Sequence, residues 1–270
     1  MNKSICHSKS NSKKIVFIFI LTAICALQFS AKAQINTQFR RPISASSPMW
    51  IIHIDTWNYP DPQKIIRLIP EDIKPYVIFN VSLSISHDTL SRFKVAEYGY
   101  EIAKSWMRTC AENRVWAMLQ VASGGMHQFS ETDLTVYEEF FQNYPNFIGF
   151  NFAEPFWGFD QVDPISAKWT DRMNLLANLL KMSNKYGGYL TVNWCGNQYS
   201  QNINPIAMLK RNTSFRTASQ LYAANYILCE KYTTVSYKSD MESICLGAYL
   251  SGYSGQYGIR YDNTGWIDST

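Results

Sequence analysis

Residues 147–154 read FIGFNFAE, an almost continuous apolar run that ends in a carboxylate. Apolar residues on both faces are typical of a strand in a parallel sheet that helices cover. Six further runs of the same kind recur along the chain, with about 30–40 residues in each unit. They are WIIHID (50–55), PYVIFNVSL (75–83), VWAMLQVA (115–122), GYLTVNW (188–194), YILCEKY (226–232) and YGIRYDN (257–263).

Amphipathic stretches separate these runs and predict helices. They cover residues 62–69, 95–113, 130–144, 168–187 and 239–252. Ser130 is the expected N-cap of the third helix, and Gly187-Gly188 should end the fourth. Strands that alternate with helices predict an α/β fold, a (β/α)8 TIM barrel. The alternative is an open doubly wound sheet, but no GxGxxG follows the first strand.

The sequence supplies only seven βα units, whereas a complete barrel has eight. Residues 34–270 should form one catalytic barrel domain, and its length is short of the typical size of about 250 residues. We therefore expect an incomplete barrel that is truncated at the C-terminus.

The N-terminus has the three parts of a secretory signal peptide. Lys13-Lys14 precede the apolar run 15–29, and Ala31-Lys32-Ala33 matches the small-x-small cleavage pattern. The alternative is a membrane anchor, but a spanning helix needs roughly 20 apolar residues. We expect residues 1–33 to be removed and the mature chain to be secreted, periplasmic or at the surface of a bacterium, with no remaining membrane span.

The formal charge of +4 comes from this leader. The first 33 residues contain five of the 25 basic residues and none of the 21 acidic ones, so 20 basic residues remain against 21 acidic. A nearly neutral body argues against nucleic acid or an anionic membrane as the partner.

The cysteines and histidines do not indicate a metal site. Four cysteines follow the leader: Cys110, Cys195, Cys229 and Cys245. Two disulfides are possible in an exported chain, but apolar neighbours favour buried free thiols. There is no CxxC pair, and His53, His87 and His127 are scattered, so we expect no metal and no other cofactor.

Polar and aromatic residues gather where the predicted strands end, which is where barrel enzymes place their active sites. Glycoside hydrolysis needs one protonated carboxyl and one ionised carboxylate. The catalytic candidates are Glu154, Glu230 and Asp262. The candidates for substrate binding are His53, Asp55, Trp57, Asn80, Gln120, Asn151, Trp157, Asn193, Trp194, Tyr261 and Trp266.

Each carboxylate also has a plain structural interpretation. Glu230 precedes Lys231 and could form a local ion pair, whereas Asp262 could begin a turn with Asn263. Asp55 could be catalytic, or it could orient His53 and Trp57.

Long segments of the chain resemble the catalytic domain of glycoside hydrolase family 98, over nearly all of the sequence after about Arg41. The segments are PMWIIHIDTWNYPDPQKII, YEIAKSWMRTCAENRVWAM, FIGFNFAEPFWGFD, NWCGNQYS, YILCEKYT, DMESICLGAYLSGY and YGIRYDNTGW.

The resemblance implies an endo-acting, inverting hydrolase on a (β/α)8 barrel, with Glu154 of the FAEPFW motif as the general acid. The family includes endo-β-galactosidases that act on blood-group glycans and endo-xylanases that act on decorated xylan. Glu230 and Asp262 match the base role only by their positions at strand ends. We expect a monomer that acts on an oligosaccharide or polysaccharide; the alternative is a non-catalytic carbohydrate-binding fragment of such an enzyme.

Overall fold

The computed structural model describes residues 35–56, 58, 61–83, 85–87, 93–95, 98–122, 129, 132–155, 167–194, 205–232 and 241–261. The described residues from Asn36 onward belong to one compact unit. The expected signal peptide lies outside the described residues. In the part of the chain that the structure describes, no helix combines the length and the apolar character needed to cross a membrane.

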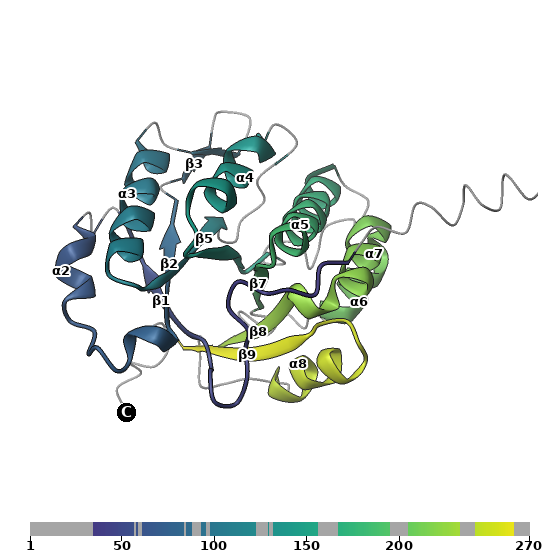
Figure 1. The fold of residues 1–270 in the computed structure, drawn as a ribbon. Coiled ribbons are helices and arrows are strands. Elements are labelled where there is room, and N and C mark those ends of the chain that lie inside the picture. The colour runs from purple at the N-terminus through teal and green to yellow at the C-terminus, as the bar shows by residue number, and fades with distance from the viewer. Residues whose placement is uncertain are drawn as a thin grey trace, which may run out of the picture. The chain divides into compact units, whose positions relative to one another are not determined.

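Seven parallel strands form one curved sheet (Figure 1). Each strand pairs with the next strand of this sheet along the chain. The strands are β1 (Trp50–Ile54), β2 (Val77–Ser82), β5 (Trp116–Ala122), β6 (Phe147–Ala153), β7 (Tyr189–Trp194), β8 (Tyr226–Tyr232) and β9 (Gln256–Tyr261). The seven predicted strands are confirmed.

The sheet is an incomplete (β/α)8 barrel. Its two end strands are β1 and β9, and the described residues contain no pairing between them. A separate antiparallel pair, β3 (Ile85–His87) and β4 (Phe93–Val95), follows β2. The barrel prediction is therefore confirmed, whereas the β3–β4 pair was not predicted.

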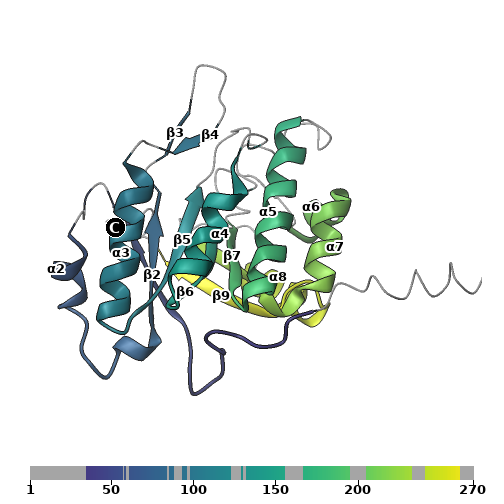
Figure 2. The same cartoon turned by 45° about the horizontal axis from the view of Figure 1, so that its top comes forward.

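Helices cover the convex side of the sheet (Figure 2), and α3, α4 and α5 lie over neighbouring strands. Among the described residues, the α-helices are α2 (Pro62–Ile66), α3 (Gly99–Glu112), α4 (Leu134–Asn143), α5 (Ala167–Tyr186), α6 (Pro205–Arg211), α7 (Thr213–Leu221) and α8 (Met241–Leu250). Two short 3-10 helices, η1 (Lys74–Tyr76) and η3 (Ala223–Asn225), precede β2 and β8. The predictions did not include α6 and α7.

Two predicted helix starts are wrong. The helix expected from residue 95 begins at Gly99, because Val95 is still part of β4. The N-cap of α4 is Asp133, whose carboxylate accepts a hydrogen bond of 2.9 Å from the Thr135 N–H. A side-chain acceptor at this position satisfies an N–H group that the helix leaves without an internal partner. Ser130, the predicted cap, lies outside the described residues.

The strands separate two apolar compartments, because successive side chains point to opposite faces. The larger core lies between sheet and helices and includes the buried rings of Trp106 and Trp169. Inside the curve, near the strand starts, Ile78, Met118 and Ile148 form a smaller apolar cluster. A third cluster around Tyr189, Ile227 and Cys229 continues this inner layer.

The cysteines of the described chain are buried free thiols, as predicted. These are Cys110, Cys229 and Cys245. Burial raises the pKa of the Cys110 thiol to about 12, because a thiolate there would lose its hydration. Cys195 lies outside the described residues.

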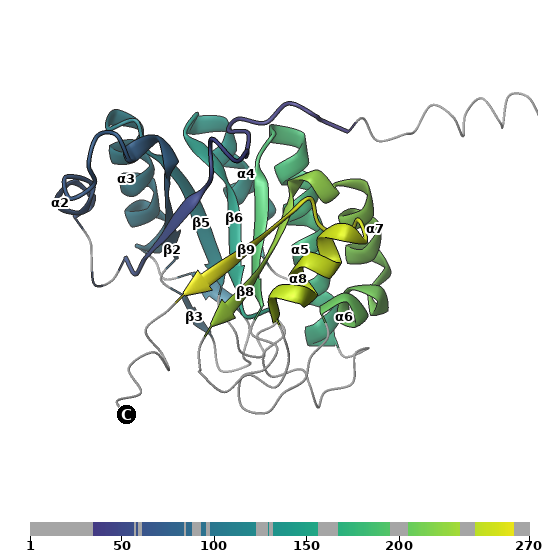
Figure 3. The same ribbon diagram turned by 90° about the horizontal axis from the view of Figure 1, so that it is seen from below.

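The segment before β1 closes one end of the barrel (purple in Figure 3). The Phe39 ring stacks on Tyr189 with 5.1 Å between ring centroids, and the Tyr189 hydroxyl donates to the Arg41 carbonyl at 2.9 Å. Gly187 ends α5 in the left-handed conformation, at a φ of 69°, and a Cβ there would come within 2.2 Å of the Gln38 carbonyl oxygen. Only glycine therefore allows this close approach.

Candidate active site

Polar side chains form a layer inside the barrel, toward the C-terminal ends of the strands. This layer lies next to the apolar inner cluster, one step closer to the C-terminal ends of the strands. Each of five neighbouring strands, β1, β2, β5, β6 and β7, contributes one residue to it. Its members are His53, Asn80, Gln120, Asn151 and Asn193. All five were predicted from the sequence as substrate-binding residues, and the structure brings them together; their role in binding stays a prediction.

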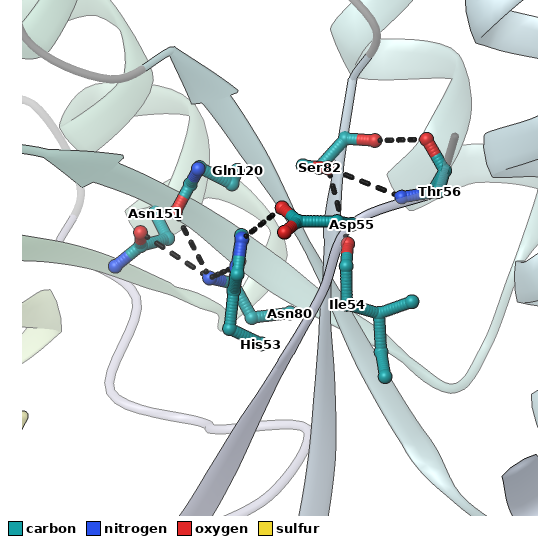
Figure 4. A network of polar contacts seen from close by, with 8 residues as sticks. All are labelled: His53, Ile54, Asp55, Thr56, Asn80, Ser82, Gln120 and Asn151. Atoms are coloured by element: carbon teal, nitrogen blue, oxygen red, sulfur yellow. Dashed lines mark hydrogen bonds and ion pairs between the residues drawn. The ribbon is translucent and has the colours of Figure 1, made fainter. Parts of the chain in front are cut away.

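Asn80 is at the centre of this amide layer (Figure 4). Its amide nitrogen lies 3.2 Å from His53 Nδ1, 3.3 Å from Gln120 Oε1 and 3.3 Å from Asn151 Oδ1. Asn151 extends this hydrogen-bond network, because its amide nitrogen donates to Asn193 Oδ1 at 3.1 Å and to the Thr191 carbonyl at 3.3 Å. Buried polar groups need such partners, so the network fixes the amides relative to one another.

The His53–Asp55 pair lies at the edge of the layer. His53 Nε2 and Asp55 Oδ1 are 2.8 Å apart, and the two side chains are 26% and 37% exposed. Because the Asn80 amide donates to Nδ1, the proton of a neutral imidazole is on Nε2 and points at Asp55. The Asp55 carboxylate therefore contacts the His53 ring directly, and whether Asp55 is catalytic or orients His53 stays a prediction.

Two hydroxyl residues that sequence reasoning missed fix the end of β1 to the end of β2 (Figure 4). Ser82 Oγ donates to the Ile54 carbonyl at 3.0 Å, and Thr56 Oγ1 donates to the Ser82 carbonyl at 3.0 Å. Both residues are buried. Their bonds hold the backbone on both sides of Asp55, and only their place after apolar runs could have indicated this.

Glu154 follows directly after β6 and has an unusual backbone. Its φ is 53°, a left-handed value that non-glycine residues rarely adopt. Its N–H donates to the Asn193 carbonyl at 2.8 Å, which extends the pairing of β6 with β7 by one residue. The side chain is partly exposed. Strained backbone gathers at functional positions, so this geometry agrees with a functional role.

Glu230 lies elsewhere. Ile227 and Cys229 of β8 belong to the inner cluster, whereas Leu228 belongs to the core beneath the helices. Alternation puts Glu230 on the same side as Leu228, and its side chain is fully buried. Burial raises the pKa of the Cys245 thiol on α8, and the nearby Cys229 and Glu230 add to this rise. The structure therefore places Glu230 next to α8 and does not bring it into the amide layer.

Two further predicted residues end strands of the sheet. Trp194 and Tyr261 are the last residues of β7 and β9, and only their backbone is described. Four predictions lie outside the described residues: Trp57, Trp157, Asp262 and Trp266.

A cavity of about 860 Å³ lies on the concave side of the sheet. Its walls come from β1, β8, β9 and residues 43–49, and His53, Asn80, Asn151 and Asn193 also line it. Glu154 and Glu230 are not among the described residues that line this cavity. It therefore gives access to the amide layer from the space between the two end strands.

The comparisons with known proteins identify the family. The family model described as "Glycosyl hydrolase family 98" matches residues 37–270, most of the chain. The chain belongs to glycosyl hydrolase family 98. No curated protein matches the chain significantly.

Solved structures of family 98 share the fold. The catalytic module of a family 98 glycoside hydrolase from Streptococcus pneumoniae TIGR4 in its native form superposes with a TM-score of 0.62 at 19% identity. Its complexes with the H-disaccharide and LewisY pentasaccharide blood-group antigens give TM-scores of 0.61 and 0.60, each at 18% identity. Each match covers 83% of this chain and 39% of the solved chain, so this family 98 chain spans about two-fifths of its solved relatives.

Proposed function

We propose that this family 98 chain is the barrel part of an exported, endo-acting, inverting glycoside hydrolase, with Glu154 as the general acid. The observation that carries the proposal is the position of Glu154. It directly follows β6, the strand that supplies Asn151, and its N–H donates to the carbonyl of Asn193, another amide-layer residue. A carboxyl beside fixed amides suits a reaction in which the amides hold sugar hydroxyls and the acid protonates the glycosidic oxygen.

The chemistry has two proton transfers. The protonated Glu154 gives its proton to the leaving oxygen as the glycosidic bond breaks, and a carboxylate base takes a proton from the water that attacks the opposite face. Glu230 and Asp262 are the proposed bases. The burial of Glu230 against α8 supports Asp262 more strongly, since Asp262 directly follows β9 in the sequence.

The substrate is proposed to be a neutral, complex glycan. The nearly neutral body of the chain agrees with such a ligand, and the solved relatives were crystallised with blood-group antigens. Decorated xylan is the other candidate. Measuring product release from blood-group glycans and from arabinoxylan separates the two substrates.

The acid assignment is tested with Glu154→Gln, which keeps the shape of the side chain and removes its proton. We expect a loss of at least about 100-fold in the rate of glycan cleavage, because general acid catalysis contributes at least this much. Near-wild-type cleavage by the variant would exclude Glu154 as the acid. Proton NMR of the first anomer released tests the stereochemistry, and net retention contradicts an inverting reaction.

The base is tested by comparing Asp262→Asn with Glu230→Gln. If Asp262 is the base, its variant loses cleavage by a factor like that of Glu154→Gln, and Glu230→Gln changes mainly the stability. The reverse pattern assigns the base to Glu230.

A non-catalytic carbohydrate-binding role is the second candidate, and the position of Glu230 favours it. If Asp262 does not act as the base, the amide layer can still hold sugar hydroxyls without hydrolysis. Calorimetric binding of a blood-group oligosaccharide with no product on prolonged incubation supports this role, and product release excludes it.

Export is proposed on the lysines, apolar run and small-x-small site of residues 1–33. N-terminal sequencing of the chain from the periplasm or medium of a bacterial host tests it. A first residue of Gln34 agrees with cleavage after Ala33, whereas an intact leader on all exported chain contradicts it.

A further inference from the structure

The backbone at Glu154 is unfavourable for two reasons. A non-glycine residue rarely has a positive φ, and a residue that precedes proline prefers an extended conformation. Glu154 has a φ of 53° and precedes Pro155. Such a turn persists only where its surroundings hold it in place.

Two contacts hold this turn, one on each side. The Glu154 N–H is bound to the Asn193 carbonyl of β7 at 2.8 Å. The Pro155 carbonyl accepts a hydrogen bond of 2.6 Å from Nη1 of Arg172 on α5. Glu154 therefore lies between a bond to the sheet and a bond to the helix layer.

Arg172 is itself fixed. It is fully buried, and its guanidinium lies 5.5 Å from the ring centroids of both Phe129 and Phe152. Phe152 is two residues before Glu154 on β6, so Arg172 contacts the strand that carries Glu154 as well as the turn that follows it. Burial lowers the pKa of Arg172 to about 9, which still leaves the guanidinium charged at neutral pH.

A buried charge is costly, and an apolar side chain of similar size often stabilises such a position better. Cation–π contacts and a charge-assisted hydrogen bond offset the cost here. The charged donor brings something that methionine could not, namely a directional bond to the Pro155 carbonyl.

We propose that Arg172 is a positioning residue that holds the Glu154 carboxyl in its reactive place by anchoring the Glu154–Pro155 turn. The proposal rests on the proposed function only in taking Glu154 as the general acid. Arg172 acts through the turn and has no direct part in the proton transfer.

The first test is structural and needs no activity. Arg172→Met keeps an unbranched side chain that can pack in the same buried position and removes the charged donor. We expect a crystal structure of this variant to show Glu154 with a negative φ and a displaced carboxyl. Arg172→Lys, which keeps a charge and one donor, is the second variant and should retain the positive φ. The proposal is overturned if the φ and the carboxyl position of Glu154 are unchanged in Arg172→Met. It is also overturned if Arg172→Lys displaces Glu154 as far as Arg172→Met does.

The second test uses the leaving group. A 2,4-dinitrophenyl glycoside of the oligosaccharide that the chain releases needs little acid assistance, because dinitrophenolate leaves without a proton. Arg172→Met should lower kcat on the natural glycan by about 100-fold, in the range of general acid catalysis, and on the dinitrophenyl glycoside by less than about 3-fold. Equal losses on both substrates contradict positioning of the acid.

Two controls separate the explanations. Leu180→Ala on α5 removes a fully buried side chain of the same helix, and it should lower both rates in proportion to the unfolded fraction.

In a Glu154→Gln background, Arg172→Met should lower kcat by less than about 2-fold, because the effects of residues that act as a unit are not additive. Full additivity overturns the proposal. Glu154→Gln with unchanged activity instead overturns the acid assignment, while the crystal structure still decides whether Arg172 holds the turn.

Discussion

At the residue scale, Asn80 connects three strands of the site through one amide nitrogen. That nitrogen has two hydrogens and three acceptors within 3.3 Å: His53, Gln120 and Asn151. Without it, the His53 ring loses the donor that keeps the Nε2 proton directed at Asp55. The order of the amide layer therefore depends on a residue that takes no part in the proposed proton transfers.

Asn80→Ala should lower the free energy of unfolding by about 1–3 kcal/mol, the usual cost of leaving buried polar partners unsatisfied. Urea denaturation measures this loss. Gln142→Ala is the control, because it removes one exposed hydrogen bond of 3.3 Å and should change stability by no more than about 0.5 kcal/mol. Nitrogen NMR of the His53 ring should show the Nε2–H tautomer in the wild type and a mixture in Asn80→Ala. An unchanged tautomer contradicts the role of Asn80.

The amide-layer residues could be predicted from the sequence, whereas the contacts of Arg172 that anchor the neighbouring turn could not. Asn80, Gln120 and Asn193 follow or interrupt apolar strand runs, so the period of the strand predicts that they reach the site. Arg172 lies inside an amphipathic helix, and no local pattern distinguishes it from an exposed arginine. Its contact with Pro155 depends on how α5 packs, which is a tertiary property.

At the element scale, β6 departs from regular alternation, and this departure sets the direction of Asn151. Ala117 and Leu119 of β5 pair with Phe147 and Phe150, so three steps on β6 match two on β5. This bulge puts both phenylalanines into the core beneath the helices, with their centroids 5.4 Å apart. Asn151 then points inward.

Gly149 makes this bulge possible. Its φ is 136°, and an added Cβ would lie 1.9 Å from the Tyr189 carbonyl oxygen. Gly149→Ala should therefore destabilise the chain by more than about 3 kcal/mol or prevent folding, since backbone atoms of β6 and β7 cannot move apart without loss of pairing. Circular dichroism and urea denaturation measure the effect.

Gly247→Ala on α8 is the matched control. Nothing lies within 4 Å of a Cβ added at Gly247, and alanine in a helix should stabilise the chain by about 0.5–1 kcal/mol. Equal behaviour of the two variants contradicts the steric argument.

Strand positions were predictable because most of the strands are apolar runs bounded by amphipathic stretches, and this pattern can be read from the sequence alone. The bulge at Gly149 was not, because only the pairing with β5 shows the extra residue. The same holds for Glu230: the sequence places it near a strand end, and the side it faces depends on the alternation within β8 and on α8.

At the scale of the whole molecule, the segment before β1 connects three other elements through one side chain. Arg40 donates to the carbonyls of Phe141 at 2.6 Å, Tyr144 at 2.9 Å, Phe147 at 3.1 Å and Tyr186 at 3.1 Å. These carbonyls belong to the end of α4, the start of β6 and the end of α5. The Arg40 guanidinium also lies over the Phe141 ring, 5.1 Å from its centroid. The backbone N–H of Arg40 donates to the Gly187 carbonyl.

Arg40→Met should therefore lower the free energy of unfolding by about 2–4 kcal/mol. The four carbonyls lose a charged donor, and each bond to a charged group is worth about 1.5–3 kcal/mol before water replaces part of it. Arg40→Lys should recover less than half of the loss, because a single ammonium cannot reach the helix ends and the strand together. Arg67→Met is the control; this arginine is exposed after α2, and its replacement should stay within about 0.5 kcal/mol. Urea denaturation gives all three values. Lysine that matches arginine at residue 40 would show that charge alone, and not the forked geometry, joins the N-terminal segment to the barrel.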